Sequence, residues 1–209
     1  MRWETVRWAE GARPEEVLAL LLERGIEPGV VVVELAGGGR GNALPAAAAA
    51  RLRRIRAVTV ADGWGHLAGA ALELACACDL LYLRRGAVLD CGGAREVPRP
   101  VVVEAFRAAG MPALRRLLLG PTPIPAEEAL ELGLAAAVLS PGEPIPLPHH
   151  ASPAALTAAR DLMRSSALGA AALALESAAF RLLFAGGHPQ EGGRAFLDGR
   201  EPDFHPRGG

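Results

Sequence analysis

The sequence predicts an α/β core followed by a helical C-terminal region, and three observations support this fold class. Runs of β-branched residues alternate with helix-like stretches as far as residue 139, an order that is typical of α/β proteins. A segment that carries five prolines follows at 140–153 and is expected to be a linker. Beyond it, residues 153–200 are rich in Ala and Leu and read as helical throughout. We therefore expect a core over 1–142 and a helical region over 143–209.

Capping residues and hydrophobic patterns place the elements of the first half of the core. Residues 13–25 are expected to form a helix, because a proline stands near the start, acidic residues occupy the first turn and a glycine ends it. The run VVVVELA at 30–36 predicts a buried strand, and the glycine-rich loop 37–41 follows it. A helix over 43–55 and a second strand over 57–61 complete this half.

The second half of the core begins with a turn at 62–66. Small, unbranched residues then predict a helix over 69–78, which leads into a strand at 79–83. Glycines and prolines predict a loop over 92–100. The remaining expected elements are helices at 101–109, 112–119 and 126–132 and a strand at 135–139.

The composition excludes several classes of function. The 22 basic residues, all arginine, are balanced by 23 acidic residues, so no net field attracts nucleic acid or a membrane surface. Without lysine, no Schiff-base chemistry is available. Three cysteines without a CxxC pair predict neither a zinc site nor a disulfide framework, and no metal site is expected. With no signal peptide and no apolar run long enough for a membrane span, we expect a soluble, cytoplasmic protein.

The glycine-rich loop between a strand and a helix also raises the alternative of a dinucleotide-binding fold. That fingerprint needs Gly, Gly and Gly or Ala at offsets 0, 2 and 5. Counting from Gly37 places Asn42 at the third position, and counting from Gly39 places Leu44 there. The fingerprint fails in both frames, which argues against nicotinamide or flavin binding.

Four segments of the chain, in order, resemble motifs of the enoyl-CoA hydratase/isomerase (crotonase) superfamily. They are GGGRGNALPAA at 37–47, AVTVADGWGHLAGAALELACACDLLYL at 57–83, LLLGPTPIPAEEALELGLAAAVL at 117–139 and EGGRAFLDGREPDF at 191–204. The resemblance implies a spiral of ββα units, with a helical C-terminal region for oligomerisation and active-site cover. It implies an acyl-CoA thioester as substrate, with coenzyme A as part of that substrate and no further cofactor. It also implies a homotrimer or hexamer, with a hetero-oligomer as an alternative.

The resemblance assigns a site around Glu73, which matches the glutamate of the family's GGGxE motif. Two backbone N–H groups in this family hold the thioester oxygen as it gains enolate charge, and the matching amides here belong to Ala43 and Ala70. An apolar environment raises the pKa of a carboxyl group, which suits Glu73 as catalytic acid/base. The alternative is a first-turn glutamate that the helix dipole alone favours.

The second glutamate of the hydratases is missing from this chain. The family's Pro-Glu pair falls on Gly92 and Gly93. Glu96 is the nearest substitute, although a solvated loop charge beside Arg95 and Arg99 explains it as well. Asp90 and Glu104 are weaker substitutes, and His66, beside the oxyanion turn, is a further candidate for substrate contact.

Two hypotheses on function follow. The first is an enzyme of the enoyl-CoA hydratase/dehydratase or isomerase type, acting through an oxyanion-stabilised enolate. A role in specialised metabolism, such as polyketide synthesis of the 3,5-dihydroxyphenylacetyl-CoA type, would fit its small size. The second is a catalytically impaired subunit that keeps the fold and binds a ligand or a partner protein.

Overall fold

The computed structural model describes residues 3–8, 13–25, 27, 29–37, 43–45, 48–52, 54–92, 99–147, 152–164, 178, 181, 182 and 184–204. Within these residues the main sheet has five parallel strands, in the order β1-β2-β3-β5-β8. A smaller sheet of β4, β6 and β7 lies beside it; β4 and β6 are parallel, and β6 and β7 are antiparallel. The strands are β1 (Trp3–Trp8), β2 (Val30–Leu35), β3 (Val58–Gly63), β4 (His66–Ala68), β5 (Leu80–Arg84), β6 (Val88–Asp90), β7 (Ile124–Pro125) and β8 (Ala137–Leu139).

The order of elements is that of a spiral of ββα units. A strand of the main sheet, a strand of the small sheet and a helix follow one another twice, as β3-β4-α3 and β5-β6-α4. This arrangement agrees with the spiral that the sequence resemblance implies. The helices are α1 (Pro14–Arg24), α2 (Ala48–Leu52), α3 (Gly69–Ala77), α4 (Pro100–Ala109), α5 (Met111–Leu119), α6 (Ala126–Glu131), α7 (Pro153–Arg164) and α9 (His188–Asp198).

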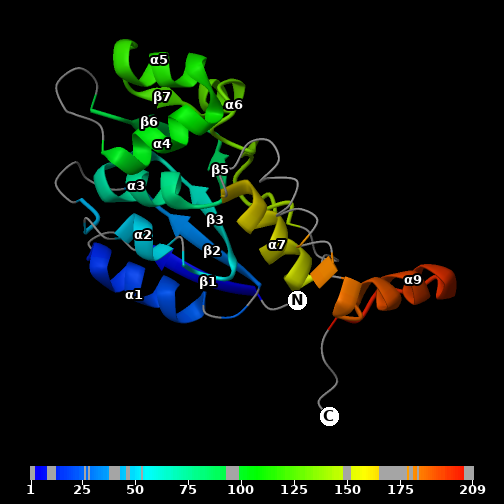
Figure 1. The fold of residues 1–209 in the computed structure, drawn as a ribbon. Coiled ribbons are helices and arrows are strands. Elements are labelled where there is room, and N and C mark those ends of the chain that lie inside the picture. Colours follow the sequence, from blue (N-terminus) through cyan, green and yellow to red (C-terminus); the bar gives the residue numbers. More distant parts are fainter. Residues whose placement is uncertain are drawn as a thin grey trace.

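The two faces of the main sheet pack against different parts of the chain (Figure 1). Alternate residues of a strand point to opposite faces. Val31 and Val33 of β2 therefore join the large core under α1, α2 and α3, whereas Val30 and Val32 face α7. A β-branched run that is buried on both faces is what a parallel sheet requires. Figure 1 also shows that α9 projects away from the sheet.

The segment after β8 was expected to be a linker, but the part of it that the structure describes packs on the sheet. Ile145 and Leu147 join the smaller core, and the hydroxyl of Tyr82 donates a hydrogen bond to the carbonyl of Pro146 at 3.3 Å. Arg160 of α7 is buried and donates to the carbonyl of Ala57 at 2.8 Å. Both contacts tie the start of the C-terminal region to the core.

The first half of the chain differs from the expected arrangement in one helix and in one additional strand. The expected helix over 43–55 is limited to Ala48–Leu52, with residues 43–45 outside it. Pro45 accounts for part of this difference, because a proline disfavours helical geometry for the residue that precedes it. The strand β1 was not expected. Its residues Val6 and Trp8 are buried and alternate with more exposed residues, and the strand lies at the edge of the main sheet.

The expected turn at 62–66 is shorter than predicted. Asp62 and Gly63 continue β3, and His66 begins β4, so that only Trp64 and Gly65 connect the two strands. The expected turn residue Asp62 instead accepts two hydrogen bonds of 2.8 Å from the buried guanidinium of Arg84. Of the helical region expected over 153–200, most of the part from 165 to 187 lies outside the described residues. No helix in the described parts of the chain is long and apolar enough to span a membrane.

Candidate active site

The candidate site is built around the point where β4 runs into α3. Ala68 ends β4 in an extended conformation, and Gly69 has a φ of 52°, in the left-handed region that favours glycine. No side chain caps the N-terminus of α3. The N–H of Ala70 is one of the helix-terminal donors that lack an intrahelical partner, and the helix dipole favours a negatively charged ligand atom there.

Glu73 lies one turn further along α3, with 5% of its surface exposed. It is the fifth residue of the helix, beyond its first turn. The interpretation of Glu73 as a first-turn glutamate favoured by the helix dipole is therefore wrong, because the helix begins at Gly69. A buried carboxylate needs a hydrogen-bonding or charged partner, so its surroundings decide what it can do.

Arg99 provides that partner for Glu73. Arg99 precedes α4 and is half exposed, and its Nε donates to Oε1 of Glu73 at 3.3 Å. The Nη2 of the same guanidinium donates to the carbonyl oxygen of Leu44 at 3.2 Å. Leu44 is buried in the large core, and Ala43 next to it is exposed. Arg99 thus links the catalytic candidate on α3 to the segment that carries the second oxyanion candidate, Ala43.

His66, the further candidate, forms a pair with a buried carboxylate. Its Nε2 lies 2.8 Å from Oδ2 of Asp90, whose side chain is 1% exposed, whereas the His66 side chain is 52% exposed. The backbone N–H of Gly92 and the hydroxyl of Thr122 each donate to Oδ1 of Asp90 at 3.1 Å. Asp90, a weaker substitute for the missing glutamate, is thus a fixed partner of His66.

The position of the missing glutamate can be followed only in part. Gly92 is the second residue after β6 and has a φ of 76°. Gly93 and the expected substitute Glu96 lie outside the described residues. Glu104, the other weaker substitute, lies on α4 and lines a cavity at the opposite end of α3.

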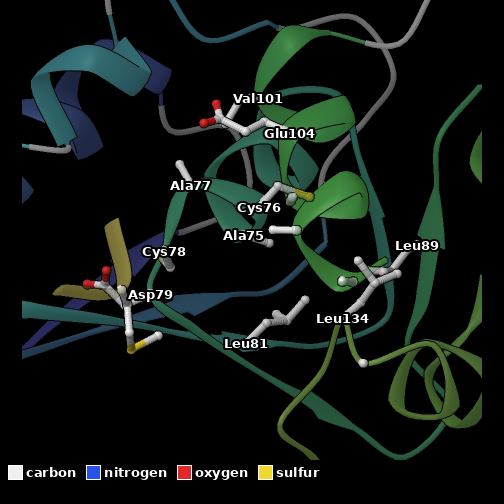
Figure 2. Close-up of a pocket in the computed structure, with 15 residues that line it drawn as sticks. Ala75, Cys76, Ala77, Cys78, Asp79, Leu81, Leu89, Val101, Glu104 and Leu134 are labelled. Carbon is white, nitrogen blue, oxygen red and sulfur yellow. The ribbon is translucent and has the colours of Figure 1, made fainter. Parts of the chain in front are cut away.

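This cavity, of about 370 Å³, is lined by the C-terminal half of α3, α4 and neighbouring residues. Figure 2 shows Glu104 of α4 and Cys76 and Ala77 of α3 on its wall. Burial raises the pKa of the Cys76 thiol, and it raises that of Cys91 to about 12. Neutral thiols with a raised pKa are poor nucleophiles and poor metal ligands, and in the described chain no cluster of three metal-ligating side chains occurs.

Comparison with solved structures finds this fold in proteins described as enoyl-CoA hydratases. An enoyl-CoA hydratase from Polaromonas sp. JS666 has a TM-score of 0.76 at 22% identity, over 90% of this chain and 87% of that one. A probable enoyl-CoA hydratase/isomerase from Mycobacterium abscessus has a TM-score of 0.75 at 22% identity, over 92% and 88% of the two chains. An enoyl-CoA hydratase/isomerase from Marinobacter aquaeolei has a TM-score of 0.72 at 20% identity, over 96% of this chain and 94% of that one.

The chain therefore has the crotonase fold, which confirms the predicted fold class and the resemblance at the level of the fold. No protein-family model and no curated protein matches the sequence. The roles of Glu73, Ala43 and Ala70 are not tested by these comparisons, and they remain predictions.

Two residues of the site were not identified from the sequence as partners of the candidates. Arg99 was noted only as a neighbour of Glu96, yet it contacts Glu73 across 26 positions of the chain. Asp90 was not connected with His66, 24 positions away. Neither spacing matches a helical or strand repeat, so no local signal in the sequence could have paired them.

Proposed function

We propose that this chain is a crotonase-like enzyme that acts on an acyl-CoA thioester through an enolate. The N–H groups of Ala43 and Ala70 would hold the thioester oxygen, and Glu73 would move the proton at the neighbouring carbon. The reaction class is dehydration or hydration, with double-bond isomerisation as its variant. The single observation that supports this best is the buried carboxylate of Glu73, one turn from the uncapped N-terminus of a helix in this fold.

The chemistry follows from the position of these groups. Removing a proton next to a thioester carbonyl leaves negative charge on the thioester oxygen, and preorganised N–H donors stabilise that charge. Each such donor contributes about 3–4 kcal/mol to the transition state. General acid/base catalysis by a placed carboxylate adds a factor of about 10²–10⁴. Arg99 donates a hydrogen bond to the Glu73 carboxylate and in this way orients it.

The test is a screen for isotope exchange in deuterated water. The purified protein and its Glu73→Gln variant are incubated with saturated, enoyl and 3-hydroxyacyl CoA thioesters, and mass spectra are recorded. We expect deuterium at the carbon next to the thioester with the wild type and a loss of at least about 100-fold in the variant. Equal exchange by both proteins would remove Glu73 from the mechanism. An absence of exchange with all thioesters would contradict the enzyme proposal.

A second candidate function is that of a binding or partner subunit. The observation that favours it is the hydrogen bond between Arg99 and Glu73, because it engages the very carboxylate that should act on substrate. In this case Glu73→Gln would leave thioester binding and biological function intact. Isothermal titration with a non-hydrolysable thioether analogue of acyl-CoA, combined with the exchange assay, separates the two cases. A binding subunit binds the analogue but catalyses no exchange, whereas the enzyme does both.

The proposal includes an oligomer, either a homotrimer, a hexamer or a hetero-oligomer. Phe196 and Leu197 on α9 are 85% and 84% exposed, and such apolar surface is usual at subunit contacts. The pathway that we propose is specialised metabolism, such as polyketide synthesis of the 3,5-dihydroxyphenylacetyl-CoA type. Mass photometry of the wild type and of Phe196→Ser tests the oligomer. A CoA-thioester panel that includes polyketide-type acyl groups tests the pathway.

A further inference from the structure

We infer that His66, held by Asp90, is a second proton-transfer residue of this site and takes the place of the missing carboxylate. This role rests on the proposed function, because it presupposes an acyl-CoA thioester at the N-terminus of α3. Glu73 removes the proton next to the thioester, and His66 handles the proton of the hydroxyl group or water at the next carbon.

A hydrogen bond to Asp90 holds the His66 ring in place. A carboxylate only accepts hydrogen bonds, so the contact of 2.8 Å assigns the proton between the two groups to Nε2 of His66. The Nδ1 atom is then the one that gains or loses a proton. Since the side chain is 52% exposed, this ring has room to meet a ligand. Asp90 is fully buried and is fixed in turn by Gly92 and Thr122, so the ring orientation is set by the protein.

The second argument is the location of the pair. In the small sheet, Asp90 is the register partner of Ala68, which directly precedes α3. His66 and Ala68 share one face of β4 because alternate residues of a strand do. The His66–Asp90 pair thus lies beside the junction of β4 and α3, where the Ala70 N–H is located. The N–H of Gly92, which donates to Asp90, belongs to the position where the family's Pro-Glu pair would fall.

A third observation places the start of the glycine-rich loop near the histidine. A methyl group added to Gly37 would lie 3.3 Å from the carbonyl oxygen of His66. Gly37 begins the glycine-rich loop that leads towards Ala43. The backbone of His66 therefore lies against Gly37 and leads, through β4, directly into the N-terminus of α3.

The proton transfers balance without any further reactant. In dehydration, Glu73 takes the proton from the carbon next to the thioester while the C–H electron pair moves towards the thioester oxygen. The enolate then reforms the carbonyl as the C–O bond at the next carbon breaks, and Nδ1 of the His66 imidazolium donates its proton to the departing hydroxide. Water and an enoyl thioester result. Proton exchange with solvent restores the two residues.

The test separates the two proton transfers in the full-length protein. Exchange at the α-carbon is measured with butyryl-CoA in deuterated water, and water addition is measured with crotonyl-CoA. We expect His66→Ala to retain exchange but to lose about 100-fold or more of kcat for water addition, with KM little changed. Added imidazole should restore part of the lost rate, which a purely structural role does not predict. Asp90→Asn should lower the same kcat, and the exposed Arg85→Ala variant is the control with no change.

Water addition by His66→Ala at the wild-type rate would overturn this role while leaving the proposed function intact. The same conclusion follows if imidazole restores nothing to a folded His66→Ala protein. Wild-type protein that exchanges the α-proton but adds no water also overturns it. A wild-type protein without any exchange refutes the proposed function itself, and this outcome is distinct from the other three.

Discussion

The buried ion pair between Asp62 and Arg84 gives a sharp prediction on stability. The two side chains are 4% and 8% exposed and are joined by two hydrogen bonds of 2.8 Å. Arg84 also donates to the carbonyl of Ser140 at 3.0 Å, and its Cζ lies 5.2 Å from the centroid of the Trp64 ring. This one guanidinium therefore joins β3, the turn before β4 and the segment after β8.

Replacing Asp62 with alanine leaves the Arg84 guanidinium buried without the carboxylate that accepts two of its hydrogen bonds. Arginine keeps its proton in proteins, so the cation does not relieve its burial by deprotonation. Breaking such a pair on one side costs about 3–5 kcal/mol, a large part of the 5–15 kcal/mol that typically separates folded from unfolded protein. We expect Asp62→Ala to lower the free energy of unfolding by about this amount.

Urea unfolding followed by circular dichroism measures this change. The control is Arg7→Ala, because Arg7 pairs with Glu34 at 2.6 Å but is 75% exposed. An exposed pair contributes about 1 kcal/mol or less, so the two variants should differ clearly. The double variant Asp62→Ala/Arg84→Met should recover much of the loss, since it no longer buries an unpaired charge. A loss below about 1 kcal/mol for Asp62→Ala would refute this reasoning.

Three other predictions concern charge and reactivity. Because burial raises the pKa of the Cys91 thiol to about 12, its alkylation by iodoacetamide at pH 8 should be slow and should accelerate on unfolding, as peptide mass spectrometry can show. Arg116 lowers the pKa of Glu128, so their stabilisation should be present above pH 4.5, the reference pKa of this carboxyl group, and should be lost as the pH falls through the lowered pKa in thermal scans. Arg99→Gln should cost about 1–2 kcal/mol in urea unfolding, because Glu73 loses a charged hydrogen bond that is open to solvent on one side.

Much of the core could be predicted from the sequence because its signals are local. The β-branched run of β2 and the small residues of α3 predict both elements to within one residue. The strand β1 was missed because its Glu, Thr and Arg residues interrupt the apolar pattern of an edge strand. The length of the helix after the glycine-rich loop was overestimated, because the alanine run favours a helix whereas Pro45 disfavours helical geometry just before it.

The candidate site was predictable only where it follows a motif. Glu73 and Ala70 follow from the resemblance, and the structure places both near the start of α3. The contacts of Arg99 with Glu73 and of His66 with Asp90 depend on how separate ββα units come together. Such contacts between distant segments leave no pattern in a single sequence.

The measurement that tests the central claim most directly is the rate of α-deuterium exchange on a saturated acyl-CoA by the wild type and by Glu73→Gln. This rate reports enolate formation alone and does not depend on which product the enzyme makes. The account predicts exchange by the wild type and a rate at least about 100-fold lower in Glu73→Gln, with the thioester still bound. Equal rates in both proteins, or thioester binding with no exchange in either, would contradict it.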